Sequence, residues 1–344
     1  MALMKKLNAI FLVIGILFFA KMLMEYDLAA IFADLSTIGP RFLWVLLLWL
    51  LILVVDTITW KHCFGDSKGK TTYLRLGLVN LAGQAINSVA PTSNLGEVVK
   101  GKMVVAQAGT AASISSVILY NFLCLVGSVL LIGLGALFAL FEARVPMGIR
   151  LLLLVSAVTL VGWLLLLMFA LNKGLSTRFI QLLTRWKIIK TPEEWLENAR
   201  HVDRSIRDFR GNHPGDFWIC VLAQLASRIF SISEVYVICQ ILGKPVSWEI
   251  ALLVMSVSQL LSWVFMMVPS QIGVMEQSSD ALFGAMDFQP GTGFTFELVR
   301  RARRIVQTFV GLLVLAVLST TRRSLTKPPG AIGKTTALSE GTKP

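Results

Sequence analysis

Long apolar runs separated by short polar segments dominate the chain. A helix needs about 20 residues to cross a bilayer, and the runs are close to that length or longer. They are continuous rather than alternating, so they predict helices and exclude a membrane β-barrel. The pattern therefore predicts an all-α polytopic membrane protein with about seven or eight transmembrane helices. The predicted helices lie at 7–24, 42–60, 113–141, 151–171, 217–242, 250–268 and 294–320.

Two polar interruptions, at 91–97 and 269–276, break this pattern about half a chain apart. Each contains a Pro, then a Gly, then a Glu, in that order. Proline ends a helix in its interior, and irregular backbone at membrane depth is stable only where protein or water surrounds it. We therefore predict two re-entrant, broken-helix hairpins, at 73–108 and 269–293, that face each other in a pseudo-symmetric repeat.

Charge and composition divide the chain into five parts. Lys5 and Lys6 precede the first run and place the N-terminus in the cytoplasm. If both hairpins are re-entrant, the full spans number seven and the tail lies outside, whereas Arg322, Arg323 and Lys327 favour the inside. Either one hairpin arm spans the membrane fully or the tail breaks the charge rule, and this conflict stays open. The expected parts are an N-terminal transmembrane helix and loop at 1–37, a first repeat at 38–172, a cytoplasmic amphipathic link at 173–215, a second repeat at 216–321 and a disordered tail at 322–344.

The composition supports a membrane protein and argues against a nucleic-acid-binding function. Hydrophobic residues make up 55% of the chain, the mean hydropathy is +0.72 and charged residues make up 15%, against about a quarter charged in soluble domains. The net charge of +12 would suggest nucleic acid in a soluble protein. Here the basic residues lie mostly between spans, which indicates topology and contact with anionic lipid headgroups and no nucleic-acid partner.

Cofactor and metal chemistry find no support in the sequence. The four cysteines are scattered without a CxxC pair, so we expect free thiols. The three histidines are far apart in sequence and lack metal-ligand spacing. No phosphate-binding loop ending in Gly-Lys-Ser/Thr is present, which argues against ATP-driven transport by this chain. We therefore expect no cofactor and no metal.

Polar residues near the interruptions form the candidate site. A helix that begins inside the membrane directs partly positive N–H groups at an anion. Lysine and arginine side chains can neutralise a phosphate. The glutamates can pair with these cations, carry a proton, or simply hold each hairpin in place. Asp56, within 42–60, is either an interfacial cap or an acid inside the membrane. The candidate substrate-binding residues are Asn87, Pro91, Asn94, Gly96, Glu97, Lys100, Arg228, Glu234, Pro269, Gln271, Gly273, Glu276, Arg300, Arg301, Arg303 and Arg304.

Residues 87–100 and 269–276 resemble the motifs of the lysylphosphatidylglycerol synthase transmembrane family, a flippase-like domain found alone or fused to a lipid aminoacyltransferase. The first motif resembles Asn, Pro, then Gly-Glu and a basic residue; the second resembles Pro, Gly, Ile/Leu-Gly-Val and Glu. This chain departs from the pattern with Lys100, where Arg is usual, and with Ser270 and Gln271, where glycines are common. The run 300–304 is similar to that of members associated with hopanoid gene clusters.

The resemblance implies a lipid transporter of the bacterial inner membrane that moves an anionic or polar headgroup between leaflets. The lipid would be a phospholipid, a polyprenyl-phosphate or a hopanoid. A membrane-embedded lipid-modifying transferase, with Glu97 or Glu276 as a base, is the alternative. A second alternative is a non-transporting accessory of a lipid-biosynthesis enzyme. A lipid-biosynthesis partner protein and a homo-oligomer are compatible with all three interpretations.

Overall fold

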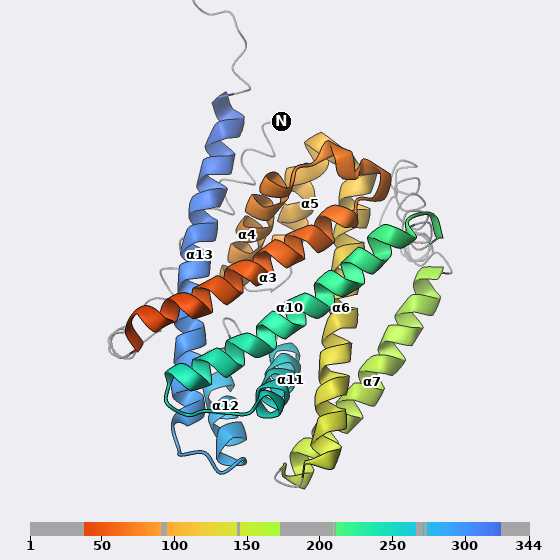
Figure 1. Ribbon diagram of the computed structural model, residues 1–344. Coiled ribbons are helices and arrows are strands. Elements are labelled where there is room, and N and C mark those ends of the chain that lie inside the picture. Colours follow the sequence, from red (N-terminus) through yellow and green to blue (C-terminus); the bar gives the residue numbers. More distant parts are fainter. Residues whose placement is uncertain are drawn as a thin grey trace, which may run out of the picture.

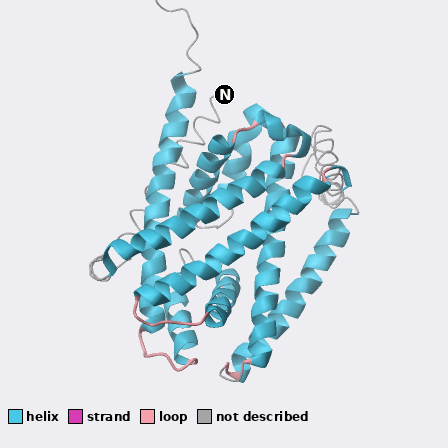
Figure 2. Ribbon diagram, in the orientation of Figure 1, coloured by secondary structure: helices cyan, strands magenta, loops and turns pink. Residues whose placement is uncertain are grey.

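The computed structural model describes residues 38–90, 95–142, 145–172, 209, 211–265, 271 and 274–324. These residues form helices joined by short loops, with no strand among them (Figure 2). Four helices are long and apolar enough to cross a membrane, namely those at 39–62, 110–141, 147–166 and 214–241. The prediction of an all-α membrane protein is confirmed.

The same order of helix lengths occurs twice along the chain. In each half a long helix is followed by two short helices and a second long helix. The third members of the two sets, α5 and α12, are the shortest in each half. The first set is α3 (Phe42–His62), α4 (Tyr73–Val89), α5 (Leu95–Ala108) and α6 (Thr110–Phe141), followed by α7 (Met147–Asn172). The second set is α10 (Pro214–Ile241), α11 (Trp248–Val264), α12 (Val274–Gly284) and α13 (Thr292–Ser324).

The two halves interlock instead of lying side by side. α3 and α10 run along each other across the front of the bundle (Figure 1). α4 packs on α13 and α11 packs on α6, so the first short helix of each half rests on the last helix of the other. α7 packs mainly against α6 and leaves most of its surface free for lipid.

The short helices of the two halves lie at opposite ends of the long ones. In Figure 1 α4 and α5 lie near the upper end, where α13 finishes, whereas α11 and α12 lie near the lower end, where α13 begins. This arrangement is the one expected for two hairpins that enter a membrane from opposite faces.

The second hairpin differs from the prediction. The sequence pattern suggested a full span at 250–268 and a hairpin over 269–293. The structure instead gives α11 17 residues, the same length as α4, so by its place in the second set α11 corresponds to α4 and α12 to α5. Within the described residues, α11 is shorter than the helices that are long enough to cross a membrane.

The last helix is longer than the pattern indicated. α13 contains 33 residues, about 50 Å at 1.5 Å per residue. It continues through Ser324, so the predicted tail begins later than residue 322. The predicted helix at 7–24, most of the link at 173–215 and the rest of the tail lie outside the described residues. All four cysteines are free, as expected.

Glycine permits the contact between α6 and α11. A Cβ on Gly135 would lie 2.3 Å from Ser256 Oγ and 2.5 Å from Ser256 Cβ, whereas a Cβ on Gly133 would meet nothing within 4 Å. We therefore expect Gly135→Ala to lower the free energy of unfolding by about 1–3 kcal/mol. Gly133→Ala, the matched control, should be neutral or stabilising by up to about 1 kcal/mol. Thermal unfolding in detergent checks this pair, and equal Tm values would contradict it.

Candidate functional site

The first hairpin holds a glutamate surrounded by donors. Glu97 lies in the first turn of α5. Its Oε1 accepts from Lys100 Nζ at 2.7 Å and Asn87 Nδ2 at 3.2 Å, and its Oε2 accepts from Asn121 Nδ2 at 3.0 Å. Lys100 is only 2% exposed. The three partners come from α4, α5 and α6, so this one carboxylate ties both arms of the hairpin to the following long helix.

Two glycines allow the arms to approach so closely. A Cβ on Gly96 would lie 2.0 Å from the carbonyl oxygen of Gly83, and a Cβ on Gly83 would lie 2.5 Å from Cγ of Lys100. The stem of Lys100 therefore crosses α4 where no side chain blocks it. Its ammonium group ends 5.2 Å from the centre of the Tyr120 ring, a favourable place for a buried cation.

The start of α5 is less open than the sequence suggested. The backbone N–H of Gly96 donates to Asn87 Oδ1 at 2.6 Å, so one free donor of this helix end is already bonded within the protein. Asn87 thus serves both the helix start and Glu97. Pro91 and Asn94 lie outside the described residues.

The second hairpin places a glutamate at the equivalent position. Glu276 is the third residue of α12, as Glu97 is of α5, and it pairs with Arg301 of α13. Gln271 donates from Nε2 to the carbonyl of Ser262 at 2.8 Å, which ties the break to α11. Pro269 and Gly273 lie outside the described residues. In each half, therefore, a glutamate at the start of the second arm contacts the next long helix.

A further carboxylate organises the arginines of α13. Glu297 is fully buried and accepts from Arg300 Nη1 at 3.0 Å and Arg304 Nη2 at 3.1 Å. Ser279 of α12 donates to it at 3.1 Å. Arg300 Nε is buried without a hydrogen-bond partner among the described residues, which leaves one donor of this cluster free for a ligand.

Arg303 links three helices. Its Nε lies 2.7 Å from Oε1 of Glu234 on α10, and its Nη1 donates to Gln307 at 3.1 Å. Gln307 in turn donates to Gln84 of α4 at 2.8 Å. This chain of contacts connects the second half of the protein to the first hairpin.

The predicted polar face of α10 does face the interior, but its two charges do not pair. Arg228 donates to the carbonyl of Cys124 at 3.0 Å, while Glu234 pairs with Arg303. Asp56 accepts from Ser227 of α10 at 3.1 Å. This contact joins α3 to α10 and is compatible with both interpretations of Asp56.

The charges of the second cluster do not cancel. Arg300, Arg301, Arg303 and Arg304 pair with three glutamates, Glu234, Glu276 and Glu297. Among the described residues, four positive charges therefore face three negative ones in this cluster. A buried excess charge is costly unless a counter-charge approaches, so the cluster is suited to an anionic group.

Several site residues were not identified from the sequence. Asn121, Glu297, Gln84 and Gln307 all lie in the two clusters. The sequence does indicate that these residues face the bundle interior, because polar residues within apolar helices usually do so. Neighbouring polar residues have the same property, so the pattern alone does not single these four out. Which of them meet depends on helix packing.

Two histidines that are far apart in sequence, His62 and His213, approach one carboxylate. His62 Nδ1 lies 2.7 Å from Asp216 Oδ1, and His213 Nδ1 lies 3.8 Å from Asp216 Oδ2. Lys68 donates to the same carboxylate at 2.9 Å. Within the described part of the chain no group of His, Cys, Asp and Glu side chains forms a metal site. We interpret this network as a connection between the ends of α3 and α10.

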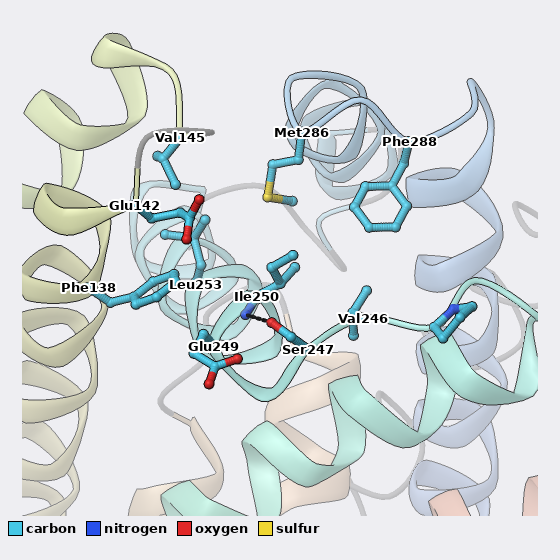
Figure 3. Close-up of a pocket in the computed structure, with 11 residues that line it drawn as sticks. Phe138, Glu142, Val145, Val246, Ser247, Glu249, Ile250, Leu253, Met286 and Phe288 are labelled. Carbon is cyan, nitrogen blue, oxygen red and sulfur yellow. Dashed lines mark hydrogen bonds between the residues drawn. The ribbon is translucent and has the colours of Figure 1, made fainter.

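Two cavities lie away from the cluster around Glu97 and from the arginine cluster of α13. One, of about 380 Å³, opens between the end of α6 and the start of α11. Glu142 extends toward it, among the apolar side chains of Phe138, Met286 and Phe288 (Figure 3). The other, of about 400 Å³, lies beside His213 and the loop after α3. No predicted site residue lines either of them.

Comparison with known proteins identifies the family. No curated protein and no solved structure matches the chain. The family described as the lysylphosphatidylglycerol synthase TM region matches residues 7–313. That range includes both glutamate clusters and every helix described above except the end of α13. The chain thus belongs to the lysylphosphatidylglycerol synthase TM region family and is a multi-pass membrane protein.

Proposed function

We propose that this protein moves a lipid with an anionic or polar headgroup between the leaflets of the inner membrane. The headgroup binds within the bundle while the acyl or prenyl tails stay in the bilayer. Family membership supports a role in lipid metabolism or transport. The observation that carries the transport proposal is the pair of buried, charged clusters at equivalent positions of the two hairpins.

The clusters suit a headgroup for an electrostatic reason. Carboxylates hold Lys100 and four arginines of α13 inside the protein, namely Arg300, Arg301, Arg303 and Arg304. These cations are therefore already in place before a ligand arrives. Arginine can bind a phosphate through two hydrogen bonds. A phosphate can replace a carboxylate partner without leaving a cation exposed to lipid, which allows the headgroup to pass from one cluster to the next.

The hairpins provide a route for the headgroup through the bundle. They enter from opposite ends of the bundle (Figure 1), and the contacts from Glu234 through Arg303 and Gln307 to Gln84 join the two halves. A change of partner at Arg303 therefore affects both halves at once. Glu97, Glu234 and Glu276 are the residues that we expect to gate the passage.

A lipid-modifying transferase is the second candidate. It would use Glu97 or Glu276 as a general base, but each of these carboxylates is paired with a cation, Lys100 and Arg301 respectively. Ion pairing favours the charged form and weakens a base. Transport fits these contacts better.

Lipid movement in proteoliposomes tests the proposal. Fluorescent phosphatidylglycerol and phosphatidylcholine are incorporated, and a reducing agent that does not cross the bilayer removes fluorescence from the outer leaflet only. We expect the protein to move the anionic probe faster than the zwitterionic one. A rate equal to that of protein-free vesicles for both probes, together with chemical turnover of either lipid, would favour the transferase instead.

A further inference from the structure

We propose that Asp56 of α3 binds a proton, and that its protonation controls how strongly the interior holds an anionic headgroup. The second part rests on the proposed transport function. The proton site itself rests on the contacts of Asp56 alone.

Asp56 differs from the other acids of the long helices. Asp216, Glu234 and Glu297 each pair with at least one lysine or arginine. Asp56 has no ion pair with any residue that the structure describes. Its Oδ1 accepts from the hydroxyl of Ser227 at 3.1 Å, and its second side-chain hydrogen-bond partner, Gln224, is also neutral. A carboxylate inside a membrane without a paired cation favours protonation.

The helix position of Asp56 directs it into the bundle. Spacings of three and four residues place it on one face of α3 with four buried side chains, those of Val45, Trp49, Leu53 and Trp60. The exposed residues of α3 lie on the opposite face, at Leu43, Trp44, Leu47, Leu50 and Val54. Asp56 is nevertheless only half-buried. Its accessible part therefore opens between the helices and not toward lipid.

The surroundings of Asp56 contain unused polar atoms. Oε1 of Gln224 and Nε of Arg228 are buried and have no hydrogen-bond partner within the described residues. Both lie next to Gly127 of α6, where a Cβ would be 3.4 Å and 3.1 Å away from them. The acceptor Oε1 of Gln224 and the donor Nε of Arg228 thus lie close together beside Gly127, which has no side chain. Such a place suits a water molecule that delivers a proton.

Charged and titratable groups from three helices act on Asp56. α4 also packs against α3, but its only charged residue is Arg75, near its first turn. The guanidinium of Arg228 repels a metal cation, and Ser227 and Gln224 are the side chains that hydrogen-bond to Asp56, so the position favours a proton over a metal cation. The groups that face Asp56 are Arg228 from α10, Lys100 from α5, and Tyr120 and Cys124 from α6.

The position near Lys100 connects this site to headgroup binding. When Asp56 is ionised, its charge offsets part of the positive charge of Lys100 and Arg228. A proton taken from water on one side forms an O–H bond on Asp56 and removes that offset, and the bond breaks when the proton leaves to the other side. Protonation therefore strengthens anion binding, and a bound anion strengthens protonation to the same extent.

Infrared spectroscopy tests the proton site without reference to transport. The protein in lipid nanodiscs is acidified, and the difference spectrum is recorded for wild type and Asp56→Asn. We expect a carboxylic-acid band in the wild type that Asp56→Asn lacks and that Ser227→Ala shifts in frequency. Asp66→Asn, whose side chain is 93% exposed, is the matched control and should retain the band. An unchanged band in Asp56→Asn overturns the proposal.

A transport measurement then separates the two proposals. In proteoliposomes with fluorescent phosphatidylglycerol, a pH gradient should change the wild-type rate, and this response should be lost in Asp56→Asn and retained in Asp66→Asn. A variant response equal to the wild type, or a response only to sodium, contradicts proton coupling. If the wild type moves no lipid but its band depends on Asp56, the proposed function fails and the proton site stands. Should Asp56→Asn not fold, the frequency shift in Ser227→Ala decides the assignment.

Discussion

Glu97→Gln is expected to abolish lipid movement and also to destabilise the protein. Glu97 is the ion-pair partner of Lys100, which is 2% exposed. Loss of one partner of a buried ion pair costs about 3–5 kcal/mol, so we expect the variant to be less stable than the wild type. Transport and Tm must be measured on the same sample. Glu249→Gln changes an exposed glutamate and is the control.

The double variant Glu97→Gln with Lys100→Met separates a structural from a functional role. Removal of both charges eliminates the unpaired lysine, so we expect much of the lost Tm to return. Transport should stay lost if Lys100 binds the headgroup. Recovery of both Tm and transport would mean that the pair only holds the hairpin together.

Arg303→Gln has the second large expected effect. The substitution leaves Glu234, which is 5% exposed, without its cation and removes the donor to Gln307. We expect the variant to lose transport and to lower the free energy of unfolding by about 3–5 kcal/mol. Arg41→Gln, at an exposed arginine outside the bundle, should change neither quantity.

A second substitution again distinguishes the two effects. Arg303→Gln combined with Glu234→Gln should recover stability, because no buried charge is left alone. Transport should not recover, since the link from α10 through α13 to α4 stays broken. Normal transport by Arg303→Gln alone would remove Arg303 from the proposed pathway.

Much of the fold was predictable because membrane helices follow from apolar length. The ends of α6 and α7 lie within a few residues of the prediction. The difference between the predicted helix at 250–268 and α11 has a physical cause. Its composition is apolar enough for a span, and only its length of 17 residues and its place beside α12 indicate a hairpin arm. Hydropathy does not distinguish a short span from an arm that turns back.

The candidate site was predictable in kind but not in its pairings. Glu97 with Lys100, three residues apart on one helix, follows from sequence alone. Glu234 with Arg303 does not, because it requires α10 and α13 to meet at one level. Asp56 shows the same limit. Asp56 makes no ion pair with the described residues because of how its neighbours on α5, α6 and α10 are arranged. No local sequence pattern contains that arrangement.

Native mass spectrometry with lipid identification tests the central claim most directly, namely that the buried cations hold a lipid headgroup. The protein is extracted gently as wild type, as Lys100→Gln with Arg303→Gln, and as Lys102→Gln with Arg41→Gln, in which both changed residues are exposed. We predict that the wild type and the exposed-site variant retain one headgroup class selectively and that the buried-site variant loses it. The same bulk membrane lipids on all three proteins would contradict the claim.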